Sequence, residues 1–81
     1  MTMTASPVYE EIIDFLAAGT TPTSLIAFRP SEAAKERVAD LIQREKSYEL
    51  SAEEHTELEH YLQLEHLMRL AKARARRYLQ S

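Results

Sequence analysis

Three histidines have the greatest potential for chemistry, and each directly follows a glutamate: His55, His60 and His66. Glu57 and His60 form a Glu-x-x-His pair, a spacing that places both side chains on one helix face and builds carboxylate-bridged metal sites in bundles. A complete site needs further ligands from facing helices, and the three histidines point in different directions around a helix. We therefore expect solvated histidines, no metal site and no cofactor.

The sequence offers no combination of residues typical of covalent or acid–base catalysis. It contains no cysteine, and no serine stands in a glycine elbow. A single glycine cannot build a phosphate-cradling loop. The 13 acidic residues include no pair that the pattern marks as a buried acid–base couple. We expect the protein not to be an enzyme.

Charge is divided unevenly along the chain. Residues 1–65 contain all 13 acidic residues and five basic ones, whereas residues 66–81 contain five basic residues and no acidic one. The net charge of −3 therefore combines an acidic body of −8 with a basic end of +5. Such an end can bind phosphate or an acidic partner, or it can complement the negative pole at a helix C-terminus.

Nucleic-acid binding has two candidate regions. Residues 22–28 and 31–46 could form a helix-turn-helix, but the second helix would begin with Glu32 and Glu36, which phosphates repel. The better candidate is the basic C-terminal segment, where three cations share one helical face: Arg69, Lys72 and Arg76. Because no aromatic residues are interleaved with these cations, the signal is weak. A nucleic-acid-associated protein is therefore the alternative hypothesis, and we do not expect direct nucleic-acid binding.

Four helices must position these residues, and the apolar spacing predicts no strand. The expected helices cover residues 7–18, 22–28, 31–46 and 52–79. Ser6 and Pro7 begin the first, and Gly19 ends it. Residues 1–5 show no periodicity, and we expect them to be disordered. The predicted fold is a single all-α domain, residues 1–81, with three short helices packed on one long C-terminal helix.

The last helix is too long for its own chain to cover. Residues 52–79 would span about 42 Å as a helix, whereas a compact globule of this length has a radius of gyration of about 12 Å. We expect the three short helices to bury the N-terminal half of the long one. Residues 66–80 would then project as a basic end with an uncovered apolar stripe.

The stripe repeats at intervals of three and four residues, the spacing of a heptad seam. An uncovered surface of this kind indicates a partner or self-association. The expected partner-binding residues are six apolar side chains and three flanking cations: Leu64, Met68, Ala71, Ala75, Tyr78, Leu79, Arg69, Lys72 and Arg76. A homodimer through paired C-terminal helices and a complex with a different protein both fit this stripe.

The chain contains no segment apolar and long enough to be a membrane span or the core of a signal peptide. The lack of cysteine is also consistent with a reducing compartment. We expect a cytoplasmic protein.

Four blocks of the sequence carry a resemblance to a known family: residues 28–31 (FRPS), Arg37-Val38 with Leu41, residues 50–54 (LSAEE) and residues 64–75 (LEHLMRLAKARA). The last block is the most specific of the four. On these residues the chain resembles a family of small uncharacterised bacterial proteins that is common in cyanobacteria. Genes of that family often lie beside a gene for an HNH-type nuclease. The resemblance implies a protein that works by binding a partner, with an antitoxin-like role toward the nuclease.

Overall fold

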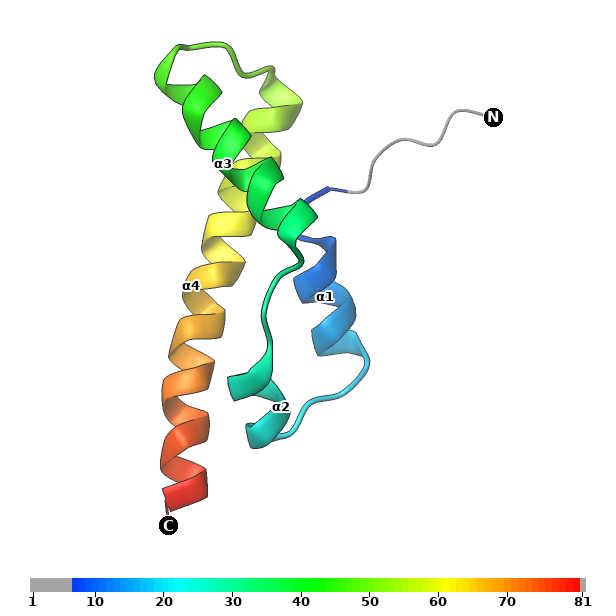
Figure 1. Cartoon of the computed structure of the whole chain (residues 1–81), viewed down its shortest axis with the longest axis vertical. Helices are drawn as coiled ribbons and strands as arrows, with labels where there is room; N and C mark the ends of the chain where they lie inside the picture. The colour runs from blue at the N-terminus through cyan, green and yellow to red at the C-terminus, as the bar shows by residue number, and fades with distance from the viewer. Residues whose placement is uncertain (1–6, 81) are drawn as a thin grey trace, which may run out of the picture.

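The computed structural model describes residues 7–80, and these form four helices (Figure 1). The helices are α1 (Glu10–Ala17), α2 (Pro22–Ala27), α3 (Glu32–Lys46) and α4 (Ala52–Gln80). No strand occurs among residues 7–80, so the all-α prediction is confirmed. Residues 1–5, which we expected to be disordered, lie outside the described part of the chain.

The molecule is elongated because one helix determines its length. The 29 residues of α4 run along the longest axis, and the molecule measures 47 × 33 × 19 Å (Figure 1). The Cα radius of gyration of 14.6 Å exceeds the value of about 12 Å expected for a compact chain of this length. Within residues 7–80, no helix combines the length and apolar character that a bilayer crossing requires.

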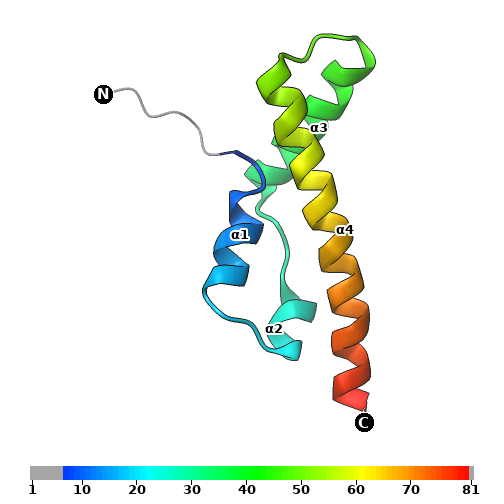
Figure 2. The ribbon, with the colours of Figure 1, turned by 180° about the vertical axis from the view of Figure 1, so that it is seen from behind.

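The three shorter helices lie beside different parts of α4. The two views place α3 beside the N-terminal half of α4 and α2 beside its C-terminal half, with α1 near the middle (Figure 1, Figure 2). The core joins residues from α1, α3, α4 and the turn before α1: Val8, Ile12, Ala34, Leu41, Leu58, Tyr61 and Met68. The rings of Phe15 and Phe28, 4.5 Å apart, pack the end of α1 against the segment that links α2 to α3.

α1 begins three residues later than predicted. The N–H of Val8 donates to Glu57 Oε2 on α4 at 2.9 Å, and the Pro7 carbonyl accepts from the N–H of Glu10 in a turn. Because Val8 is held to α4, residues 7–9 form a separate turn and do not belong to the helix. The predicted cap, Ser6, lies outside the described residues. Gly19 ends α1 as predicted, with a φ of +94°.

The other three helices begin where the cap signals predicted. Thr21 caps α2 and Ser31 caps α3, in each case by accepting from a backbone N–H three residues later. At the start of α4, Ser51 and Glu54 exchange hydrogen bonds of 3.1 Å as a capping box. α2 ends one residue earlier than predicted, since Phe28 is already extended, and α4 continues one residue further.

Two arginines of α3 fix its position on α4. Arg37 donates to both carboxylate oxygens of Glu57, at 3.0 and 3.3 Å, and Arg44 donates to both oxygens of Glu54, at 3.0 and 2.6 Å. Both ion pairs are bidentate, with two parallel hydrogen bonds between guanidinium and carboxylate, which is the strongest geometry for such a pair. Glu57 therefore joins three parts of the chain, because it also accepts from Val8.

The turn that follows α3 contains a strained residue. Tyr48 has a φ of +58°, and the N–H of Glu49 closes the helix end by donating to the Arg44 carbonyl at 2.9 Å. This pattern normally places glycine in the left-handed position. The Tyr48 side chain is 97% exposed, so its ring gains little from packing.

We expect Tyr48→Gly to increase the free energy of unfolding by about 1 kcal/mol, since glycine adopts the left-handed conformation without the clash at Cβ. For a domain of this size the melting temperature should rise by about 4–8 °C, measured by circular dichroism. Tyr48→Ala is the control, because it removes the ring and keeps Cβ. An equal gain in both variants would show that backbone strain is not the cause.

Stability should also depend on the Arg44–Glu54 pair at low pH. Hydrogen bonds from the Arg44 guanidinium, and then from the Ser51 N–H, lower the pKa of Glu54 to about 2, from an ordinary value of 4.5. A carboxyl with a lowered pKa in the folded state stabilises the fold above its unfolded pKa. That contribution is lost as the pH falls from about 4.5 to about 2.

We expect the free energy of urea unfolding to fall across this pH window, and to fall less in Glu54→Gln. Glutamine can still cap Ser51 but has no charge to lose. Glu53→Gln, one residue earlier and exposed, is the matched control and should keep the wild-type profile. Identical profiles for all three proteins would contradict a role for this pair.

Candidate protein-interaction surface

α4 presents a buried apolar face and a second face that is partly apolar and partly exposed. The buried face carries Leu58, Tyr61, Met68 and Ala75, each at most 4% exposed. The second face, which we call the outer seam, repeats at intervals of four and three residues: His60, Leu64, Leu67, Ala71, Arg74 and Tyr78. The heptad seam expected from the sequence combined members of both faces, and this part of the prediction is wrong.

The sequence led us to expect an uncovered C-terminal half of α4. In the structure, most of this half is covered. Met68 is 4% exposed and Ala75 is 3% exposed, because α2 lies beside this half of α4 (Figure 2). Leu25 of α2 and Phe28 after it pack against the core that contains Met68. Burial ends at Ala75, and residues 76–80 are exposed. The projecting end is therefore confined to little more than one turn.

The remaining apolar residues of the predicted site lie in different environments. Leu64 and Ala71 are half-buried, whereas Tyr78 is 68% exposed and Leu79 is 55% exposed. Only Leu64, Ala71 and Tyr78 belong to the outer seam. Met68 and Ala75 serve the fold of the chain itself, so they cannot form a partner surface while α2 is in place.

The three predicted cations do not form one stripe open to solvent. Lys72 is half-buried: its Nζ donates to the Phe28 carbonyl at 2.7 Å and lies 5.9 Å from the centroid of the Phe28 ring. Burial lowers the pKa of Lys72, and the nearby charges of Arg29 and Arg76 lower it further. Arg69 is exposed and pairs with Glu65 at 2.7 Å. Lys72 thus ties α4 to the end of α2.

A groove between α1 and α4 lies along the first half of the outer seam. It has a volume of about 330 Å³ and is lined by six residues: Tyr9, Ile13, His60, Gln63, Leu64 and Leu67. Ile13 is 42% exposed and Leu67 is 52% exposed. The ring of His60 packs edge-on against that of Tyr9, with centroids 5.3 Å apart.

Sequence reasoning did not assign Ile13 and Leu67 to the site. In the sequence, Leu67 lies beside the predicted stripe of the last helix, and Ile13 is one of several apolar residues in the first predicted helix. One signal in the sequence could have identified them: on each helix, the apolar residues cover a wider arc than packing against one core requires. Their proximity across the groove depends on how α1 packs, which the pattern of either helix alone does not specify.

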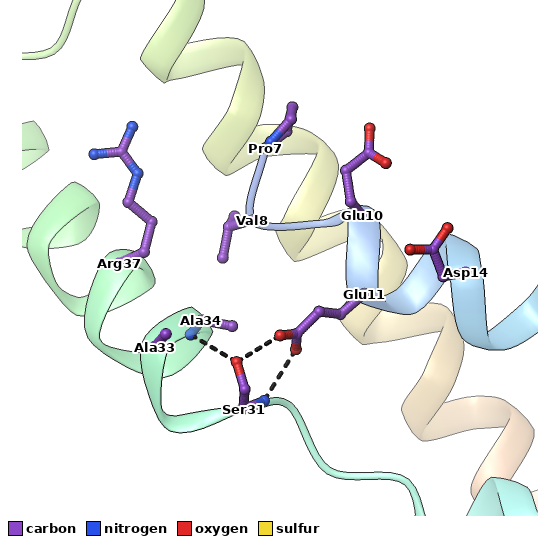
Figure 3. A pocket seen from close by; sticks show the side chains of 9 residues that line it. All are labelled: Pro7, Val8, Glu10, Glu11, Asp14, Ser31, Ala33, Ala34 and Arg37. Carbon is purple, nitrogen blue, oxygen red and sulfur yellow. Dashed lines mark hydrogen bonds between the residues drawn. The ribbon is translucent and has the colours of Figure 1, made fainter. Parts of the chain in front are cut away.

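A larger hollow lies elsewhere, between α1 and the start of α3, with a volume of about 460 Å³ (Figure 3). The carboxylate of Glu11 accepts hydrogen bonds from both the N–H and the hydroxyl of Ser31, and these bonds lower the pKa of Glu11. Ser31 in turn accepts from the N–H of Ala34. Glu11 therefore anchors α1 to the first turn of α3.

The histidines are all exposed and lie apart from one another along α4. His55 Nε2 lies 3.7 Å from a carboxylate oxygen of Glu45, and His60 contacts Tyr9. Among residues 7–80, no three histidine or carboxylate side chains are grouped so that they could hold a metal ion.

No family model, curated protein or solved structure matches this chain.

We expect Met68→Ala to lower the free energy of unfolding by about 2 to 3 kcal/mol, because it leaves a cavity between α4 and α2. Leu62→Ala is the matched control on the same helix. Leu62 is 45% exposed, so its loss should change stability by no more than about 0.5 kcal/mol. Urea unfolding measures both values. A Met68→Ala cost as small as that of Leu62→Ala would contradict the packing of α2 on α4.

Proposed function

We propose that this protein is a non-enzymatic interaction module that binds another protein through the outer seam of α4 and the groove beside α1. One observation carries the proposal: large apolar side chains are exposed along one flank of the molecule. Ile13, Leu67 and Leu70 are 42%, 52% and 57% exposed, and the first two line the same groove. Neighbouring exposed apolar side chains indicate an interaction site in a folded domain.

The shape of this surface suits a helix as the bound element. Two helices side by side leave a groove that accepts the apolar face of a third, anchored at intervals of three and four residues. The outer seam has that spacing. Its polar members, His60 and Arg74, limit the registers in which a partner helix can lie, because a charged or polar group in a seam favours some pairings and opposes others.

The family resemblance supplies the class of partner. We take the HNH-type nuclease encoded beside genes of that family as the protein bound, with the present chain in an antitoxin-like role. Binding at the outer seam leaves the buried face of α4 intact, so the chain can keep its own fold in the complex. The side-chain caps of α2, α3 and α4 and the ion pairs between α3 and α4 help to hold this surface in one shape.

A nucleic-acid-associated role for the basic end is less well supported. Lys72 is half-buried and held by the Phe28 carbonyl, and Arg69 is paired with Glu65. Two of the three cations that share a helical face are therefore already engaged within the chain. Phosphate binding would have to displace these contacts.

We expect the nuclease to co-purify with the tagged wild-type chain after co-expression, and Leu67→Asp to reduce its retention by about tenfold or more, a change of at least about 1.4 kcal/mol in binding. Leu62→Asp is the matched control: Leu62 is also exposed but lies about 140° around the helix from Leu67. Circular dichroism checks that both variants are folded.

Equal retention by the two variants, or no retention by the wild type, would contradict the proposal. Retention that falls steeply with salt and disappears after nucleic acid is digested would instead favour the nucleic-acid alternative.

A further inference from the structure

We propose that, in the absence of another partner, a second copy of this chain occupies the groove, with the two α4 helices antiparallel about a two-fold axis beside Leu70. The inference rests on the proposed interaction surface, since both use the outer seam. It adds the identity of one occupant, the direction of its helix and the register of pairing.

The outer seam is complementary to itself when it is reversed. Its first half, around Leu64 and Leu67, is flanked by α1 and forms the groove. Its second half, at Ala71, Arg74 and Tyr78, is a convex helix face. An antiparallel second copy would place the convex half of each chain into the groove of the other. An interface of this kind uses the same patch twice and closes as a dimer.

The spacing of the seam defines one register for this arrangement. Positions at equal distances from the centre of the seam fall opposite each other, which gives three pairs in each half of the dimer: His60 with the partner's Tyr78, Leu64 with the partner's Arg74, and Leu67 with the partner's Ala71. The central layers pair a large residue with a small one, which lets the helices approach closely. Leu70, 57% exposed beside the seam, would meet the partner's Leu70 near the axis.

Charge selects the antiparallel direction. The five basic residues of the C-terminal segment all lie between positions 69 and 77, and the acidic residues lie at position 65 or earlier. Parallel helices would set the two basic ends side by side, within the distance over which charges interact at physiological salt, about 8 Å. Antiparallel helices would instead set Arg77 beside the partner's Glu59, an acidic residue.

The dimer and the nuclease complex would exclude each other, because both cover Leu67. Self-association would then compete with nuclease binding, and the free chain would be stored with its apolar flank covered. Binding of one partner lowers the apparent affinity for the other by mass action.

Introduced cysteines can test the geometry, since the chain has none of its own. Leu70→Cys should form a disulfide-linked dimer under mild oxidation, and Leu62→Cys, on another side of α4, should not. Leu64→Cys alone and Arg74→Cys alone should stay uncrosslinked. In each case the cysteines of the two chains would lie about 15 Å apart along the helix axis, too far for a disulfide. A mixture of these two variants should crosslink.

Sedimentation velocity provides the second measurement. The wild type should form a dimer as its concentration rises, and Leu67→Asp should remain a monomer at all concentrations. Crosslinking of Leu64→Cys by itself would overturn the antiparallel arrangement. A wild-type chain that stays monomeric throughout would overturn the dimer.

The outcomes also separate this inference from the proposed function. A monomeric wild type that still binds the nuclease through Leu67 would overturn the dimer and support the interaction module. A dimer with the predicted crosslinks and no nuclease binding would support the inference and contradict the nuclease as partner.

Discussion

The structure depends on one constraint: α4 is longer than the rest of the chain can enclose. Its 29 residues extend for about 43 Å, and the three shorter helices together have the same number of residues, 29. These helices can cover α4 only by lying along it at different heights. Because their apolar sides face α4, they cover one face of the long helix and leave another flank open, with Leu67 and Leu70 on it.

Polar contacts decide where along α4 each short element lies. Near the N-terminal end, Arg37 and Arg44 of α3 pair with Glu57 and Glu54, and toward the other end Lys72 bonds to the Phe28 carbonyl. No charged residue among residues 7–80 is buried, and partly exposed ion pairs contribute modestly to net stability because solvent screens their attraction. A shift of α2 or α3 along α4 would break these contacts, so they favour the observed positions of the two helices.

The same contacts limit what the basic end can do. A run of cations in a sequence suggests a surface that binds phosphate. Here, however, Lys72 is hydrogen-bonded to a backbone carbonyl of the same chain, and Arg69 is paired with a glutamate of its own helix. Two leucines beside these cations, Leu67 and Leu70, are 52% and 57% exposed. Exposed leucines at helical spacing are the larger source of binding energy available to this chain, because removing apolar surface from water drives association.

Local sequence determined the four helices, since caps such as Thr21, Ser31 and Ser51 and the breaker Gly19 act within a few residues. It also identified α4 as the helix with an apolar surface in excess. The candidate site was only partly predictable: Leu64, Ala71 and Tyr78 belong to the outer seam, but Met68 and Ala75 are core, and Leu67 and Ile13 were not assigned. Intervals of three and four residues fit two seams on neighbouring sides of the same helix, and no local signal distinguishes them. Only the tertiary structure decides, because the positions of α1 and α2 against α4 determine which seam loses contact with water.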